Sequence, residues 1–281
     1  MIRKCDFDIS ASMARENEAY AKSLKEPWVE AMIENINSPA KFISWFEQNV
    51  LYVDFLEVLS TLPDKRRILD VGAGLGYTSV YCALKGHSVT AIEPSPEFCD
   101  VIEKISENVD AKIDIWISSA GHMIPDQSEK FDIVIFHSSL HHCDDPCGAL
   151  RNANASLTHG GNCFLISEPV LNCFRSKAWF NYTNEKHPEA MGYYGGNEHI
   201  YRVTEYEEML KKAGFKDICV IQPCRYKYAP YFHSGTPLPK RIVKKSFYYL
   251  IRYFLKSRSY RLFHPLFKAM SLLQYTFVGT K

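Results

Sequence analysis

The chain has 281 residues, of which 46% are hydrophobic and 23% charged, and its formal net charge is +1. This ordinary globular composition excludes a disordered or fibrous chain, and the length suits one enlarged domain or two small ones. No apolar run approaches the roughly 18 residues of a membrane span, the first residues carry no signal-peptide core, and the nine cysteines form no CxxC pair, so we expect a cytoplasmic protein with reduced thiols.

A helical N-terminal region precedes a regular alternation of strands and helices. Residues 1–62 are expected to be helical, as an N-terminal cap on the rest of the chain. Gly86 is predicted to end the first helix of the alternation, Ser95 with Pro96 to begin the second, and the Gly160-Gly161 pair to end the helix before the fifth strand. By apolar density and flanking turn residues, the strands are predicted at 66–71, 87–93, 111–118, 131–137 and 162–168.

Two further strands are expected near the C-terminus. Thr204 to Glu207 reads as a capping box for a helix that runs to Gly214. A sixth strand is predicted at 217–222, and a seventh in the final QYTFVGTK. The expected fold is therefore α/β, a doubly wound and mostly parallel seven-stranded sheet. Its predicted parts are a cap at 1–62, a core at 63–168, an insertion at 169–203, a helix and strand at 204–222, a basic insertion at 223–272 and a final strand at 273–281.

The C-terminal part of the chain is strongly basic. Residues 218–281 contain 12 Lys and Arg and no Asp or Glu, which leaves 21 basic and 32 acidic residues in 1–217. Within this basic region, residues 240–257 place basic and apolar side chains at helical spacing, on opposite faces of a predicted helix. Such a helix suits an anionic membrane surface, and on this interpretation predicts a peripheral location at the membrane. It equally suits the acidic remainder of this protein or a twin subunit, whereas nucleic-acid binding is a weaker reading.

A glycine-rich turn follows the first predicted strand. Asp70 is followed by glycines at 72, 74 and 76, in a D-x-G-x-G-x-G pattern. Such glycines let the backbone approach a ligand closely at the carboxyl end of a parallel strand. Tyr77 stands where a dinucleotide fingerprint needs glycine, so a nicotinamide cofactor fits poorly. Glu93 ends the second strand, where a carboxylate can accept hydrogen bonds from a ribose diol.

Over roughly residues 65–222 and at the final strand, the sequence resembles the class I S-adenosylmethionine-dependent methyltransferases. The resemblance rests on ILDVGAGLGYTS, AIEPS, FDIVIFHSSLHHCDDP, LTHGGNCFLISEP and AGFKDICVI. LHH followed by DP is typical of the branch with quinone-biosynthesis and small-molecule methyltransferases. The resemblance implies a Rossmann-like methyltransferase fold, an antiparallel last strand beside the sixth, and S-adenosylmethionine as cofactor.

The resemblance also implies roles for residues at the strand ends. Asp70 and the loop 72–76 would hold the methionine end of the cofactor, and Glu93 the ribose hydroxyls. Many members place an Asp after the third strand against the adenine amine, whereas this chain has Ser118, Ser119 and Ala120, so that contact would pass to a hydroxyl or the backbone. The carbonyl of His137 would lie under the methionine amino group. The expected cofactor-binding residues are Asp70, Gly72, Ala73, Gly74, Gly76, Tyr77, Glu93, Pro94, Ser119, Ala120 and His137.

Histidines after the fourth strand are candidates for acid-base chemistry. Neutral imidazole can take a proton near pH 7, so His141 or His142 could act as a general base, although histidines there often only pack the loop above the cofactor. Cys143 and Cys147 add soft ligands nearby, but adjacent residues point in different directions, and no metal is expected. The expected substrate-binding residues, after the fifth strand, are Glu168, His199, Tyr201 and Arg202.

These observations favour methyl transfer by in-line displacement to a small molecule or to a lipid- or saccharide-linked acceptor. The N-terminal helices and residues 169–203 would enclose that acceptor. A second interpretation stays open, because a fold does not fix a function. The chain could be a non-catalytic binding protein that keeps the cofactor fold as a scaffold and docks on a membrane or partner through its basic C-terminal segment.

Overall fold

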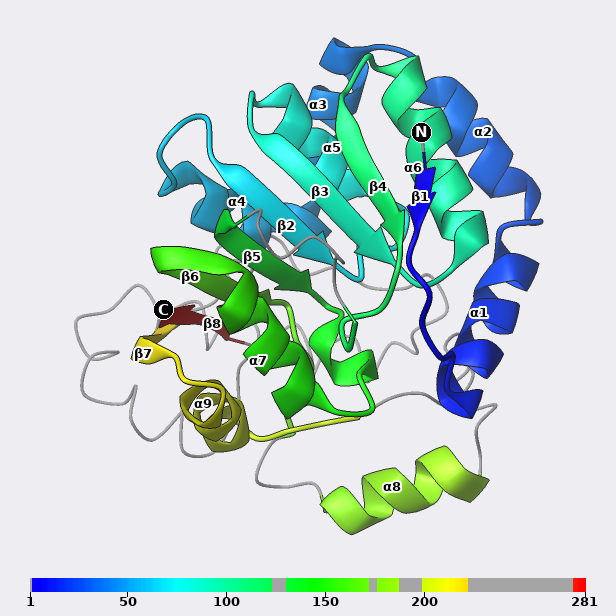
Figure 1. Ribbon diagram of the computed structural model, residues 1–281. Helices are drawn as coiled ribbons and strands as arrows, with labels where there is room; N and C mark the ends of the chain where they lie inside the picture. Colours follow the sequence, from blue (N-terminus) through cyan, green and yellow to red (C-terminus); the bar gives the residue numbers. More distant parts are fainter. Residues whose placement is uncertain (1, 123–129, 172–175, 187–198, 222–274) are drawn as a thin grey trace, which may run out of the picture.

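The computed structural model describes residues 2–122, 130–171, 176–186, 199–221 and 275–281. These residues form one sheet of eight strands in the order β1-β4-β3-β2-β5-β6-β8-β7, with helices packed around it (Figure 1). The strands are β1 (Ile2–Lys4), β2 (Arg67–Val71), β3 (Ser88–Glu93), β4 (Ile113–Ile117), β5 (Phe131–His137), β6 (Leu157–Ile166), β7 (Lys216–Ile221) and β8 (Thr276–Thr280).

The pairing of the strands confirms a doubly wound, mostly parallel sheet. Each neighbouring pair is parallel except those made by β8, which lies antiparallel between β6 and β7. The central strand β2 pairs with β3 on one side and β5 on the other, so the strand order reverses there. In β2, four of five residues are buried, as expected for a parallel strand covered on both faces. A ligand crevice is expected at the carboxyl ends of β2 and β5.

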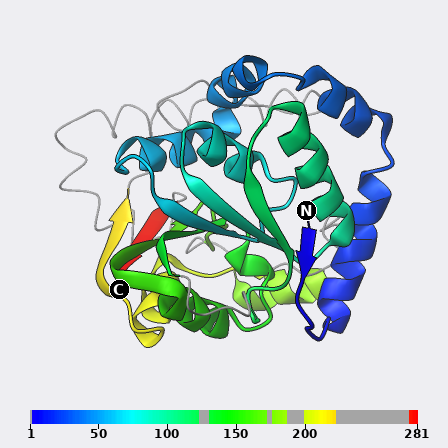
Figure 2. The same ribbon diagram turned by 45° about the horizontal axis from the view of Figure 1, so that its top comes forward.

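Helices cover both faces of this sheet (Figure 2). One face carries α3, α4, α5 and α6, and the other carries α7 and α9. The element bounds are α1 (Ala11–Ser23), α2 (Pro27–Asn35), α3 (Pro39–Gln48), α4 (Val53–Ser60), α5 (Tyr77–Leu84), α6 (Pro96–Asn108), α7 (Pro146–Ser156), α8 (Lys177–Lys186) and α9 (Val203–Lys212), with short 3-10 turns η1 (Val50–Tyr52) and η2 (Leu140–His142). The predicted start of α6 is confirmed, since Ser95 is the N-cap and Pro96 opens the helix.

Two sets of buried side chains hold these layers together. Successive residues of β2 point to opposite faces, so Ile68 joins the cluster under α3 to α6 while Leu69 joins the cluster under α7 and α9. The N-terminal helices contribute Phe42, Phe46 and Phe55, which are fully buried. Leu51, in the same N-terminal region, is 59% exposed instead.

The structure corrects several local predictions. Residues 2–4 are not helical but form β1, an eighth strand at the sheet edge parallel to β4. The strand predicted at 162–168 begins at Leu157, directly after α7. Gly160 and Gly161 therefore lie within β6, where the register against β5 shifts between Phe131 and Ile133. A side chain at 161 would meet the Asp132 carbonyl oxygen at 2.9 Å, which explains a glycine at this bulge.

Helix α9 also begins earlier than predicted. Its N-cap is Arg202, whose backbone N–H donates to Glu205 Oε2 at 2.7 Å, so the expected capping box at 204–207 is displaced by two residues. The predicted basic insertion at 223–272, including residues 240–257, lies outside the described residues. No helix in the described ranges is both long enough and apolar enough to span a membrane.

Candidate functional site

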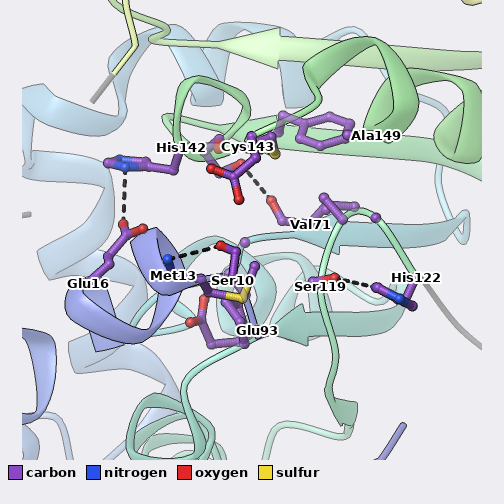
Figure 3. Close-up of a pocket in the computed structure, with 18 of the residues that line it drawn as sticks. Ser10, Met13, Glu16, Val71, Glu93, Ser119, His122, His142, Cys143 and Ala149 are labelled. Atoms are coloured by element: carbon purple, nitrogen blue, oxygen red, sulfur yellow. Dashed lines mark hydrogen bonds and ion pairs between the residues drawn. The ribbon is translucent and has the colours of Figure 1, made fainter. Parts of the chain in front are cut away.

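A pocket of about 430 Å³ opens at the carboxyl ends of β2, β3 and β5, at the position where the strand order reverses (Figure 3). This volume lies within the range of small-molecule and cofactor sites. Segments distant in the sequence meet there. The residues that line it include Asp8, Ser10, Met13, Glu16, Asn17, Tyr20, Val71–Gly74, Glu93, Pro94, Phe98, Ser119–His122, Phe136–Ser139, His142–Asp145, Gly148, Ala149 and Asn152.

The glycine-rich turn forms one wall of the pocket. The backbone N–H groups of Gly72 and Ala73 both donate to the Ile92 carbonyl, at 2.9 and 3.0 Å, which fixes the turn against β3. Gly72 has φ +70, and a Cβ there would meet Ser139 Cβ at 2.6 Å. Ser139 in turn donates its hydroxyl to the Val71 carbonyl at 2.6 Å. A glycine at 72 is therefore required by both backbone conformation and space.

Glu93 presents a buried carboxylate to the same pocket. Its Oε2 accepts the Gly74 N–H at 2.8 Å and its Oε1 accepts the Ser95 N–H at 3.0 Å. Burial raises the pKa of Glu93 to about 7, against the lowering effect of these two N–H groups, and the charges of Glu16 and Asp70 raise it further. Each carboxylate oxygen can accept more than one hydrogen bond, so Glu93 retains the capacity to bind a ribose diol. A Cβ at Gly74 would meet no atom within 4 Å.

Three residues expected at the cofactor lie behind the pocket instead of in its lining. Asp70 is buried, and its Oδ2 accepts the hydroxyls of Thr78 at 2.6 Å and Ser79 at 2.7 Å. Burial raises the pKa of Asp70, although these two hydrogen bonds oppose that shift. Gly76 caps α5 with φ +74, and the Tyr77 hydroxyl contacts Met32. These contacts fix the junction between the turn and α5. Because none of the three residues is in the pocket lining, their direct contact with the cofactor stays a prediction.

The residues expected around the adenine do line the pocket. Ser119 and Ala120 follow β4 and line the pocket together with Pro94. The Ser119 hydroxyl lies 3.0 Å from His122 Nδ1. Asn152, which the sequence did not indicate, donates its side-chain amide to the carbonyls of Ala120 and Gly121, at 3.2 and 2.7 Å, and so holds this loop in place. His137 also lines the pocket, with its ring 5.7 Å from that of Phe55.

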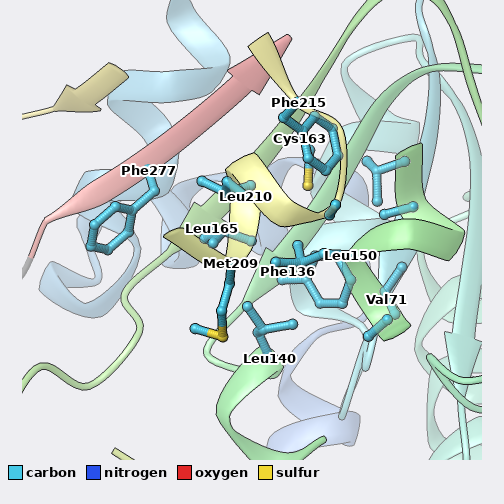
Figure 4. Close-up of a cluster of buried hydrophobic side chains, with 14 of the residues drawn as sticks. Val71, Phe136, Leu140, Leu150, Cys163, Leu165, Met209, Leu210, Phe215 and Phe277 are labelled. Carbon is cyan, nitrogen blue, oxygen red and sulfur yellow. The ribbon is translucent and has the colours of Figure 1, made fainter. Parts of the chain in front are cut away.

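The two adjacent histidines of η2 have different environments. His141 is buried outside the pocket lining, with Nδ1 2.8 Å from Glu168 Oε2. Leu140 beside it packs into the cluster under α7 and α9 (Figure 4). His142 lines the pocket, and its Nδ1 lies 3.0 Å from Glu16 Oε1. Of the two candidate bases, only His142 is therefore placed to meet a molecule in the pocket.

None of the four residues expected to bind substrate is in the pocket lining. Glu168 is fully buried, and its carboxylate accepts the backbone N–H groups of Ser139, Leu140 and His141 at 3.0 to 3.1 Å. Burial raises the pKa of Glu168, but His141 and these N–H groups outweigh it and hold that pKa below its usual value. Glu168 therefore anchors the η2 turn, and its contact with a substrate stays a prediction.

The other three expected substrate residues lie around this anchored turn. The His199 N–H donates to the His141 carbonyl at 3.1 Å, and burial lowers the pKa of the His199 ring. Burial raises the pKa of Tyr201 to about 12, and its ring lies 4.8 Å from the Lys177 ammonium group. Arg202 caps α9. Their part in substrate binding stays a prediction.

Helix α1 supplies pocket residues that no sequence motif indicated. Asn17 donates to the Pro94 carbonyl at 3.3 Å, and the Tyr20 ring lies 4.6 Å from that of Phe98. These two contacts attach α1 to the segment after β3 and to α6, on one side of the pocket. The sequence predicted an N-terminal cap over the site, but not which residues of the cap would face it.

In the part of the chain that the structure describes, the charged side chains that line the pocket are all acidic. Five of its lining residues are carboxylic acids, and none of the described lining residues is Lys or Arg; the acids are Asp8, Glu16, Glu93, Asp144 and Asp145. Such a lining favours a positively charged ligand over an anionic one. S-adenosylmethionine carries a sulfonium cation, so its charge fits this lining. Within the described ranges, no group of three or more His, Cys, Asp or Glu side chains is placed to hold a metal ion.

A doubly wound sheet, a glycine turn at the reversal of strand order and a carboxylate on the neighbouring strand are features of nucleoside-binding α/β folds. The antiparallel β8 between β6 and β7 agrees with the sheet expected for S-adenosylmethionine-dependent methyltransferases. Residues 45–220 match the family model described as a methyltransferase domain. The chain belongs to this family. The expectations of fold and of cofactor class are confirmed.

Curated relatives match the chain over part of their length. The ubiquinone biosynthesis O-methyltransferase of Xanthomonas campestris pv. campestris (strain B100) is 32% identical over 117 residues, which are 42% of this chain and 48% of that protein. The protein of the same description from Xanthomonas axonopodis pv. citri (strain 306) is 34% identical over 103 residues, 37% of this chain and 43% of that protein. The chain thus spans about half the length of the curated relatives it matches.

Solved structures share the fold. YcgJ from Bacillus subtilis aligns with a TM-score of 0.51 at 18% identity, over 62% of this chain and 70% of that one. Phosphoethanolamine N-methyltransferase 2 from Haemonchus contortus, in complex with S-adenosyl-L-methionine, aligns with a TM-score of 0.52 at 18% identity, over 93% of this chain and 60% of that one. At these identities the likeness concerns the fold alone.

Proposed function

We propose that the chain binds S-adenosylmethionine in this pocket and transfers its methyl group to a hydroxyl of a small or lipid-linked molecule. The observation that carries the cofactor assignment is the contact between Glu93 and the Gly74 N–H, because it joins the glycine turn and the acidic strand end into one wall of the pocket. The turn 72–74 would hold the methionine end, Glu93 the ribose hydroxyls, and the loop from Ser119 the adenine.

When bound, the cofactor supplies a methyl group that the sulfonium already makes a strong electrophile. The protein's task is therefore to orient an acceptor atom in line with the carbon–sulfur bond and to exclude water. Orientation of this kind contributes on the order of 7–11 kcal/mol in well-aligned systems. The position of the pocket between α1 and η2 supports this role, since both elements contribute lining residues to it.

An oxygen acceptor is supported by the description of the curated relatives and by the histidine in the pocket lining. The curated relatives are described as O-methyltransferases, and a hydroxyl is a weak nucleophile until it loses its proton. His142 lines the pocket and is the histidine of η2 that we propose as general base. The acidic lining disfavours acceptors with a phosphate or carboxylate near the methylated oxygen. We therefore propose a neutral phenol or alcohol, free or linked to a lipid or saccharide.

Two measurements test this proposal. Isothermal titration calorimetry with S-adenosylmethionine and with NAD should show micromolar binding of the first and weak or no binding of the second; tighter NAD binding would overturn the cofactor assignment. Methyl transfer from labelled S-adenosylmethionine to catechol, to a prenylated catechol and to a primary amine then tests the acceptor. Transfer to the amine alone refutes an oxygen acceptor, and cofactor binding without any transfer favours a scaffold protein.

Membrane contact by residues 240–257 is a separate part of the proposal. It is supported by the excess of basic residues in this C-terminal segment. Co-sedimentation with vesicles of neutral lipid, and with vesicles that contain anionic lipid, tests it. Pelleting with the anionic vesicles alone is expected; equal pelleting with both, or none, contradicts a charge-driven contact.

A further inference from the structure

Glu16 is the one buried residue in helix α1, whose other described positions are partly or fully exposed. Only 7% of it is accessible to solvent. A carboxylate is costly to bury unless a partner compensates it, so the position of Glu16 calls for a specific partner. Its Oε1 accepts the Tyr20 hydroxyl at 2.9 Å and lies 3.0 Å from His142 Nδ1 (Figure 3).

Helix α1 is fixed on both sides of the pocket. On the β3 side, Asn17 donates to the Pro94 carbonyl at 3.3 Å. On the η2 side, the Ser12 hydroxyl donates to Asp144 Oδ1 at 2.8 Å. Glu16 lies between these two attachments along the helix. The helix therefore braces the pocket, and its carboxylate reaches η2 at a defined point.

The pair formed by His142 and Glu16 differs from the adjacent pair formed by His141 and Glu168. His141 is paired with Glu168 inside the protein, where the same carboxylate also accepts three backbone N–H groups. That pair fixes the turn. The other pair, His142 with Glu16, consists of two pocket-lining side chains that come from separate elements.

We infer that Glu16 is a positioning residue that orients His142 as the general base of methyl transfer, and that α1 thereby completes the catalytic site. The inference rests on the proposed function for its chemistry. A carboxylate at Nδ1 holds a proton on that nitrogen, which makes Nε2 the basic nitrogen of the ring. Glu16 then fixes both the tautomer and the direction of the ring toward the acceptor hydroxyl. The hydroxyl proton passes to Nε2 as the oxygen bonds to the methyl carbon; the bond from that carbon to the sulfonium sulfur breaks, its electron pair stays on the sulfur, and neutral S-adenosylhomocysteine leaves.

The first test reads the tautomer of His142 by long-range proton–nitrogen NMR with nitrogen-15 histidine, at pH 8 and without any acceptor. The His142 signals are assigned from their loss in His142→Gln. We expect the proton on Nδ1 in the wild type and in Glu16→Gln, which keeps an acceptor oxygen, and a mixture of tautomers in Glu16→Ala. Glu18→Ala serves as the matched control on the same helix, because Glu18 is exposed and pairs with Lys22. A proton on Nε2 in the wild type, or no change in Glu16→Ala, overturns the inference.

The second test uses methyl transfer to catechol. His142→Gln should lower kcat by about 100-fold to 10,000-fold, as for loss of a general base. Glu16→Ala should lower kcat by about tenfold to 100-fold, with KM and cofactor affinity within about threefold, and add nothing when combined with His142→Gln. Glu16→Gln should recover part of this loss. Additive effects, or a change confined to KM, refute the positioning role.

The two tests separate the two ways of being wrong. If the protein transfers no methyl group to any acceptor, the proposed function fails while the tautomer still decides whether Glu16 controls His142. If transfer proceeds but neither the tautomer nor kcat depends on Glu16, the proposed function stands and the inference fails. Thermal unfolding of each variant checks that α1 stays folded, and Glu18→Ala gives the reference midpoint.

Discussion

The affinity for S-adenosylmethionine should fall below neutral pH because Glu93 loses its charge there. Burial raises the pKa of Glu93 to about 7 in the free protein. Ribose hydroxyls donate to a carboxylate, so the ionised form is the one that binds. With a pKa of about 7, the ionised fraction falls about tenfold between pH 8 and pH 6, and the affinity should fall with it by about tenfold.

The same group makes the stability of the free protein depend on pH. Because the folded pKa of Glu93 lies above its ordinary value of 4.5, folding favours the protonated carboxyl. Its contribution is complete below about pH 4.5 and is lost as the pH rises through 7. At about 1.4 kcal/mol for each pH unit, the gap corresponds to roughly 3 kcal/mol of unfolding free energy.

Calorimetric titrations at pH 6, 7 and 8 test the first statement, and urea unfolding between pH 5 and 8 tests the second, each on the wild type, Glu93→Gln and Glu107→Gln. Glu107 lies on the exposed surface of α6 and serves as the control. Any titration of the ligand itself is common to the three proteins, so only the difference between them counts. The reasoning is wrong if Glu93→Gln loses affinity toward low pH as steeply as the wild type, or if its unfolding free energy between pH 5 and 8 changes in parallel with the wild type.

Three substitutions probe the turn and its support. Gly74→Trp should weaken cofactor binding at least tenfold in calorimetry while the protein still unfolds cooperatively, since a Cβ there would meet no atom within 4 Å and the strain at φ +56 costs only about 1–2 kcal/mol; unchanged affinity contradicts the assigned wall. Gly76→Ala should cost about 2 kcal/mol in urea unfolding, because φ is +74 and the new Cβ would meet Ile102 at 2.6 Å, and a loss below 0.5 kcal/mol would show that α6 yields easily. Glu168→Leu should destabilise by about 3 kcal/mol, because it leaves buried N–H groups without an acceptor; full stability would mean that water replaces the carboxylate.

Local patterns determined the strands and the cofactor turn. The apolar runs of β2, β3 and β5 are buried on both faces, and such runs predict parallel strands without any knowledge of their partners. The Gly72 turn and the Ser95 cap were equally predictable, because backbone conformation and helix capping depend on neighbouring residues. The role of Glu93 as a ribose-binding carboxylate was predicted from its position at the end of the second strand.

The sequence did not predict the short or irregular elements. β1 has only three residues and gains its partner in β4, so its own composition carries no strand signal. The early start of β6 depends on a bulge that its glycines allow, and the same glycines equally predict the end of a helix.

The sequence by itself determined the class of fold, the cofactor turn and the presence of histidines near it. Only the tertiary structure decided that His142 faces the pocket and that the carboxylate of Glu168 anchors the η2 turn. It also decided that the carboxylate of Glu16 lies in the pocket lining. Contacts such as that of Ser12 with Asp144, 132 positions apart, depend on the packing of α1 across the sheet. A pattern of neighbouring residues carries no information about such pairs, because burial and side-chain direction arise only when distant elements pack together.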